Sequence, residues 1–177
     1  MTLSAWTRFL ALGLAGLVLQ VGVLDQIVVG GTHADALVLL AGAAGVVLGP
    51  GQGATVGFVL GLFADAVVEL PFGLSALTFV LVAFVAGLAA GATAGRDRPS
   101  ADAALCVVAA AAGTLLYALL GALLGQPDML GSHTAIALLV VTLGAVILGF
   151  PALAATRWAA GSGRGPASVP SGGSALG

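Results

Sequence analysis

Six long apolar runs, separated by short polar segments, constrain the fold of this 177-residue chain more than any other feature. The runs cover residues 5–24, 34–48, 54–70, 74–94, 101–124 and 134–156. Roughly 20 helical residues cross the ~30 Å hydrocarbon core of a bilayer. Hydrophobic residues make up 60% of the chain and charged residues only 7%, whereas soluble domains average about a quarter charged residues. The sequence therefore predicts an all-α integral membrane protein, a bundle of about six transmembrane helices.

The basic residues predict the orientation of the chain. All five are arginines: Arg8, Arg96, Arg98, Arg157 and Arg164. Arg8 lies one turn inside the start of the first run, Arg96 and Arg98 follow the fourth, and Arg157 and Arg164 follow the last, so six crossings place all five on one side of the membrane. Basic residues near the ends of spans are retained on the cytoplasmic side. We therefore expect a multi-pass protein with both termini in the cytoplasm.

Two features of this layout allow other interpretations. The first run could be a signal peptide, but its end is a poor small-residue cleavage site, so we expect a retained anchor. The short second and third runs could instead form a re-entrant hairpin between four full spans, which leaves the arginines on the same side. Residues 1–158 form the predicted membrane domain, and the Gly/Ser/Pro-rich residues 159–177 are predicted to be a disordered cytoplasmic tail.

The composition disfavours several classes of function. The chain has no lysine, and its net charge of −2 without a basic cluster argues against nucleic acid as a partner. No His/Cys/Asp group has the spacing of a metal site, and no serine has the histidine and acid of a catalytic triad. The single cysteine, Cys106, lies in an apolar run, where a small buried side chain is expected. We expect no catalytic residues, no cofactor and no metal.

A four-residue repeat stands out in the third run. Gly53, Gly57, Gly61, Asp65 and Glu69 recur every four residues, and residues four apart share one face of a helix. Helices in lipid associate through small residues that let their backbones approach closely. The repeat predicts a helix-packing face, which either packs within this chain or binds a partner.

Asp65 is the most specific residue in that repeat. The predicted span places it about five residues from the outer end, or roughly 7 Å inside at 1.5 Å per residue. An aspartate at a helix centre costs about 2.5–3.5 kcal/mol on insertion scales, and such residues usually face protein or water at functional sites. The alternative is a hydrogen-bonded acid that fixes the turn at residues 69–73. Both interpretations stay open.

The stretch from Gly57 to Gly91, GFVLGLFADAVVELPFGLSALTFVLVAFVAGLAAG, resembles the family of the rod shape-determining protein MreD. A glycine-spaced helix ends in an aspartate, a short Pro/Gly turn follows, and Gly-Leu-x-Ala-Leu opens a helix that finishes near Ala-Gly. The matching region covers about a third of the chain; the fifth and sixth runs match only as apolar helices.

This resemblance implies a function and a set of partners. It implies a non-enzymatic membrane scaffold of the bacterial cell-elongation complex, in the cytoplasmic membrane, which acts through the single-span protein MreC. That complex couples the MreB filament to the RodA glycosyltransferase and a class B penicillin-binding protein in peptidoglycan synthesis. Apart from these proteins, membrane lipid is the expected partner.

The family also resembles the substrate-binding subunits of energy-coupling-factor transporters in its six-helix fold, and a small-molecule transporter subunit is the alternative function. A chain with a single tyrosine and no asparagine offers few groups for a polar ligand. We expect Gly57 and Gly61 to pack a helix and Asp65 to anchor the turn. Phe72 and Gly73 are expected to shape an outer loop that a partner can contact.

Overall fold

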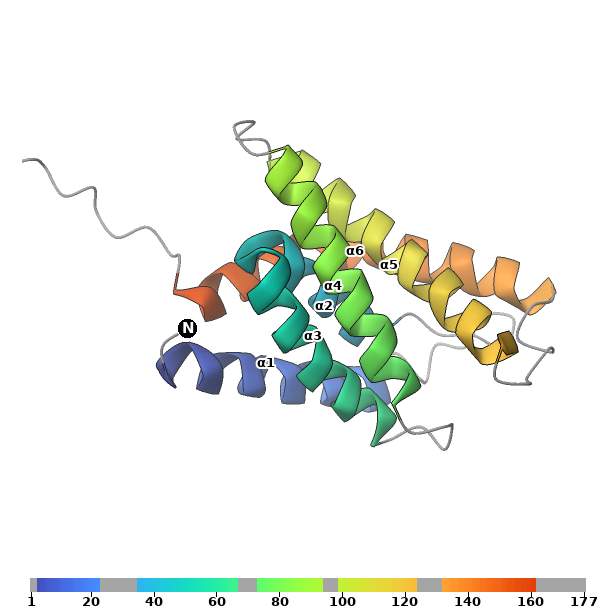
Figure 1. Ribbon diagram of the computed structural model, residues 1–177, viewed down its shortest axis with the longest axis horizontal. Helices are drawn as coiled ribbons and strands as arrows, with labels where there is room; N and C mark the ends of the chain where they lie inside the picture. Colours follow the sequence, from blue (N-terminus) through green and yellow to red (C-terminus); the bar gives the residue numbers. More distant parts are fainter. Residues whose placement is uncertain (1–2, 23–34, 67–72, 94–98, 124–131, 162–177) are drawn as a thin grey trace, which may run out of the picture.

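A computed structural model describes residues 3–22, 35–66, 73–93, 99–123 and 132–161 (Figure 1). These residues form six α-helices: α1 (Leu3–Gly22), α2 (Ala36–Leu48), α3 (Pro50–Asp65), α4 (Leu74–Ala92), α5 (Pro99–Leu123) and α6 (Ser132–Ala160). The described part of the chain contains no strand. Helices α1, α4, α5 and α6 each contain a segment long and apolar enough to cross a membrane. The predicted all-α bundle is confirmed, and the chain is a multi-pass membrane protein.

Helix α2 is the centre of the bundle. It packs against each of the other five helices, and every residue from Ala36 to Gly45 is buried. Its 13 residues extend only about 20 Å at 1.5 Å per residue, which is less than the ~30 Å of a hydrocarbon core. A backbone surrounded by protein does not face lipid at its ends. The enclosure of α2 therefore explains how a helix this short fits a membrane domain.

The helix ends gather at two opposite ends of the bundle (Figure 1). At one end, the guanidinium of Arg8 on α1 lies 5.4 Å from the ring centroid of Trp158 on α6, and Arg157 pairs with Asp102 on α5. We call this the arginine end. Asp65, the last residue of α3, and the start of α4 lie at the other, which we call the aspartate end. Arg8 and Arg157 thus share one end, as predicted; Arg96, Arg98 and Arg164 lie outside the described residues.

The bounds of α3 differ most from the sequence prediction. The third predicted run begins at residue 54, but the helix begins four residues earlier, at Pro50. Proline is favoured at the first helical position because its missing N–H would have no partner there. Gly49 alone makes the turn, with a φ of 81° that favours glycine. The helix also ends at Asp65 rather than at residue 70.

Smaller corrections apply to the later helices. Helix α5 begins at Pro99, so Pro99 and Ser100 belong to the helix and not to the predicted polar linker. Helix α6 continues to Ala160, four residues beyond the predicted end, and includes Pro151. The remainder of the predicted disordered tail, from residue 162 onward, lies outside the described residues. Cys106 is fully buried, as predicted.

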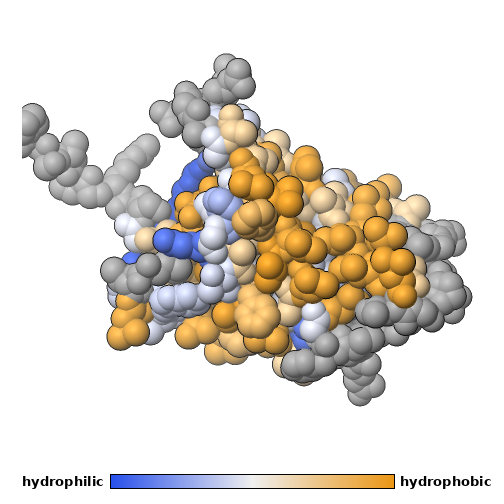
Figure 2. Space-filling model, in the orientation of Figure 1, coloured by the Kyte–Doolittle hydropathy of each residue, from blue (hydrophilic) through white to orange (hydrophobic). Residues whose placement is uncertain are grey.

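Large apolar side chains cover the outside of the bundle. Figure 2 shows a nearly continuous hydrophobic surface over α4 and α5, which becomes paler over the N-terminal part of α3. The exposed side chains on α4 and α5 include Leu77, Phe84, Val85, Leu88, Val108, Leu115 and Leu119. A water-facing surface of this kind would aggregate, whereas acyl chains solvate it. The surface therefore agrees with a location in the bilayer.

Glycines bring the backbones of α2, α3 and α4 into contact. A Cβ atom added to Gly45 on α2 would lie 2.1 Å from the carbonyl oxygen of Ala83 on α4. One added to Gly53 on α3 would lie 2.5 Å from the Cα atom of Gly45, and one on Gly87 of α4 would lie 2.5 Å from the nitrogen of Pro50. No side chain fits at these positions unless the helices move apart. The three helices therefore form one closely packed unit.

We predict that Gly45→Ala lowers the thermal stability of the protein purified in detergent. Alanine gains up to about 1 kcal/mol in helix propensity, but overpacking a tight interior costs about 1–3 kcal/mol, and a backbone carbonyl cannot rotate away. Gly91→Ala on α4 is the control, since nothing lies within 4 Å of a Cβ there. The melting temperature should fall for Gly45→Ala and stay level or rise for Gly91→Ala. Equal melting temperatures for the two variants would contradict the close packing.

Candidate functional site at the α3–α4 hairpin

The predicted glycine face of α3 packs against α4. A Cβ atom on Gly57 would lie 2.6 Å from the carbonyl oxygen of Phe79, and one on Gly61 would lie 2.3 Å from the Cα atom of Ala76. Both glycines are buried. Of the two interpretations left open by the sequence, the geometry supports packing within the chain. A partner helix cannot reach this face without displacing α4.

Asp65 is buried and binds the start of α4. Asp65 is the last residue of α3, and only 7% of the surface of this residue is exposed. The Oδ2 atom accepts hydrogen bonds from the backbone N–H groups of Gly73, at 3.0 Å, and Ala76, at 3.2 Å. The Oδ1 atom accepts one from the N–H of Ser75, at 3.0 Å. A single carboxylate therefore joins the end of one helix to the first turn of the next.

This arrangement stabilises a helix terminus that has no cap of its own. The first N–H groups of a helix have no partner within the helix. The N-terminus is also the positive end of the helix dipole, so a negative charge there is favourable. The residue at the cap position of α4 is Gly73, which has no side chain to accept these bonds and adopts a φ of 104°. Asp65 takes over the role of the cap from the neighbouring helix. The geometry supports the interpretation that it anchors the turn.

The position of Asp65 also corrects the sequence analysis. Because α3 ends there, the carboxylate lies at the end of the helix and not five residues before it. Within the described ranges, its hydrogen bonds are to the backbone N–H groups of Gly73, Ser75 and Ala76, which is the chemistry of a structural cap. Phe72, the remaining predicted site residue, and the rest of the turn at residues 69–72 lie outside the described residues.

The first N–H groups of α2, which also lie at the aspartate end, are likewise hydrogen-bonded to side-chain oxygens. The Oδ1 atom of Asp35 accepts hydrogen bonds from the N–H groups of Leu37 and Val38, at 2.9 and 3.1 Å. The Oε1 atom of Gln20 on α1 accepts one from the N–H of Ala36, at 2.8 Å. Asp35 directly before an apolar run is a recognisable N-cap signal, whereas no local signal points to Gln20.

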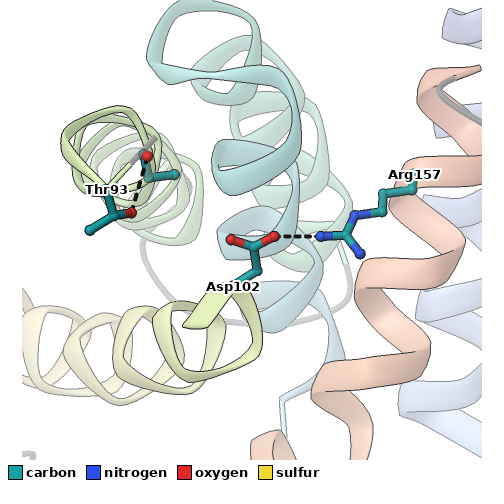
Figure 3. Close-up of polar contacts among 4 residues, drawn as sticks. Thr93, Asp102 and Arg157 are labelled. Carbon is teal, nitrogen blue, oxygen red and sulfur yellow. Dashed lines mark hydrogen bonds and ion pairs between the residues drawn. The ribbon is translucent and has the colours of Figure 1, made fainter. Parts of the chain in front are cut away.

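The arginine end contains an ion pair that the sequence did not indicate. Figure 3 shows Asp102 of α5 pointing toward Arg157 of α6, with Thr93 at the end of α4 nearby. The Arg157 side chain is 42% exposed and that of Asp102 32%. The hydroxyl of Thr93 donates within its own helix, to the carbonyl oxygens of Ala89 and Ala90. Exposed pairs of this kind contribute about 0–1 kcal/mol, so this one mainly orients the two helix ends.

Among the described residues, no group of three or more His, Cys, Asp or Glu side chains is placed to hold a metal ion. No protein-family model, no curated protein and no solved structure matches this chain. The resemblance to the MreD family therefore rests on the residues between Gly57 and Gly91 alone.

We predict that Asp65→Asn loosens the start of α4. An amide retains one oxygen acceptor and directs two N–H donors toward groups that are themselves donors. A buried donor left without a partner costs about 1–3 kcal/mol. Hydrogen–deuterium exchange in detergent, followed by mass spectrometry, should show faster exchange in peptides that contain residues 73–78.

Thr55→Ala on the same helix is the control for this measurement. Its hydroxyl is exposed and donates to the carbonyl of Gly51 in its own helix, so its loss should not change exchange at the start of α4. Unchanged exchange in Asp65→Asn would show that the carboxylate does not cap α4.

Proposed function

We propose that this protein is a non-enzymatic membrane scaffold of the bacterial cell-elongation complex, which helps to position peptidoglycan synthesis and acts through an MreC-like single-span protein. MreB, RodA and a class B penicillin-binding protein are then its indirect partners. The proposed location is the bacterial cytoplasmic membrane. The arginine end faces the cytoplasm, because basic residues at span ends are retained there.

One observation supports this proposal above the others: the residues that resemble the family form one physical unit. The spaced glycines Gly57 and Gly61 contact α4, and Asp65 binds its first turn. Gly73 supplies the left-handed backbone at the start of α4, and the N–H of Ala76 reaches the carboxylate. Among the described residues of this stretch, the spaced glycines, the aspartate and the start of α4 therefore contact one another. A unit of this kind is a more specific resemblance than six apolar helices.

The same unit suggests how a scaffold presents a partner surface. The bond between Asp65 Oδ2 and the N–H of Gly73 holds these two residues, which flank the segment 66–72 in the sequence, close together at the aspartate end. This segment includes Phe72, and in the proposed orientation it lies on the outer side of the membrane. A partner that meets this segment gains affinity from a rigid base, because less ordering is needed on binding.

The transporter alternative receives less support from the geometry. A site for a polar small molecule needs convergent polar groups in a pocket. At the aspartate end the side-chain oxygens of Gln20, Asp35 and Asp65 accept hydrogen bonds from the backbone of α2 and α4. These groups already serve the fold.

We predict that Gly61→Leu and Asp65→Ala fail to restore rod shape to cells that lack this protein. The first variant drives α3 and α4 apart, and the second leaves the N–H groups at the start of α4 without an acceptor. Gly91→Leu is the matched control, because nothing lies near a Cβ at that position. Cell length-to-width ratio is measured by microscopy, with membrane levels checked by immunoblot. Full rescue by both site variants at normal levels would show that the hairpin has no role in cell shape.

We predict that Phe72→Ala weakens recovery of the MreC-like partner by about tenfold in affinity purification from native membranes. Loss of a buried aromatic anchor at an interface costs at least about 1–2 kcal/mol, and 1.4 kcal/mol corresponds to a factor of ten. Phe58→Ala on α3 is the control, since Phe58 is 47% exposed on the outside of the bundle and should leave recovery unchanged. Recovery of a transmembrane coupling subunit with its ATPases, instead of MreC or wall synthases, would identify a transporter component.

A further inference from the structure

A groove lies between α1, α2 and α6. Its volume is about 210 Å³, and its lining consists of leucine, alanine, glycine and proline residues, among them Leu12, Ala15, Leu40, Pro151 and Ala155. None of these side chains is polar. Ala15 and Pro151 are exposed, so the groove opens to the outside of the bundle. Water has no partners in an apolar cavity of this kind, and in a bilayer the surrounding solvent is acyl chain.

The groove leads to a cation at the arginine end. Leu12 on α1 and Ala155 on α6 are the lining residues nearest to that end. Arg8 lies one turn before Leu12 on the same face of α1, and Trp158 lies three residues after Ala155 on α6. The guanidinium of Arg8 lies 5.4 Å from the centroid of the Trp158 ring. The two helices that form the walls of the groove therefore meet at this cation–π pair.

The contacts of Arg8 leave capacity for an anion. Its Nη1 atom donates to the carbonyl oxygen of Trp158, at 3.5 Å, and a guanidinium has five N–H donors in all. The nearby acid, Asp102, pairs with Arg157. No ion pair of Arg8 is recorded within the part of the chain that the structure describes. The charge at the end of the groove is therefore complementary to a negatively charged group.

We propose that the groove and Arg8 together bind an anionic phospholipid, with one acyl chain between α1 and α6 and the phosphate at the guanidinium. Basic sites between transmembrane helices bind anionic lipid headgroups, and arginine binds phosphate through paired N–H donors. The indole of Trp158, which is 59% exposed, adds an amphipathic ring of the kind found at headgroup level. The lipid would fill the space beside α1, whose main contacts with the bundle are to α2, α3 and α6.

The headgroup is tested with the full chain in vesicles of equal parts phosphatidylglycerol and phosphatidylcholine. The protein is extracted in mild detergent, and the retained lipid is quantified by mass spectrometry. We expect phosphatidylglycerol to be enriched over phosphatidylcholine by about tenfold, the effect of one charge-assisted contact. Arg8→Gln should remove this preference, and Arg8→Lys should keep part of it. Equal retention of the two lipids by the unaltered protein, or an unchanged preference in Arg8→Gln, would overturn the assignment.

The groove is tested separately with Ala15→Phe, which fills it from an exposed position. The variant should retain several-fold less of both lipids. Ala154→Phe is the matched control, because Ala154 is also exposed but does not line the groove. If Ala15→Phe retains as much lipid as Ala154→Phe, the acyl chain does not lie in the groove. Ala155→Leu replaces Ala15→Phe if that variant is unstable in detergent.

A photo-crosslinking amino acid at position 15 identifies the occupant in native membranes. Crosslinks to phospholipid support the proposal. A crosslink to a second polypeptide, without lipid, would show that a partner helix occupies the groove and would overturn it. None of these outcomes depends on the role in cell shape, because that role is tested through the α3–α4 hairpin and not through α1 or α6.

Discussion

Close approach of backbones among α2, α3 and α4 is the constraint on which the rest of this bundle depends. Lipid tails are as apolar as leucine, so burial of apolar surface does not drive helices together within a membrane. Dispersion contacts replace it, and they weaken steeply with distance. Gly45, Gly53, Gly57, Gly61 and Gly87 each occupy a place where a side chain would collide with neighbouring backbone. The remaining helices pack around this unit.

The membrane imposes a second constraint, which is seen at the buried N-termini of α2 and α4. A backbone N–H without an acceptor is costly where no water is present. Helices α2 and α4 both begin inside the protein at the aspartate end, and each receives a side-chain oxygen from the helix before it. Gln20 reaches the N–H of Ala36, and Asp65 reaches those of Gly73, Ser75 and Ala76. These bonds hold the first turns of α2 and α4 in place. They also join α1 to α2 and α3 to α4.

The sequence predicted the features that depend on local pattern. Apolar runs of sufficient length indicated the helices, and the four-residue spacing of Gly57 and Gly61 indicated a packing face. The start of α3 was predicted wrongly because Pro50 and the glycines after it resemble a turn, although proline also begins helices. The bond from Gln20 to the start of α2 spans 16 positions in sequence and depends on how α1 is placed. The groove beside Arg8 likewise arises from three helices distant in sequence, which no local pattern reveals.

The short, enclosed helix α2 has a consequence for biogenesis. A segment of 13 residues leaving the translocon by itself exposes its ends to hydrocarbon, because its length is below the usual 17–25 residues of a stable span. It becomes stable only when α3 and α4 arrive to cover it, and both follow it in the chain. The burial of α2 is therefore completed only after the hairpin has been synthesised, although α2 is the earlier part of the chain.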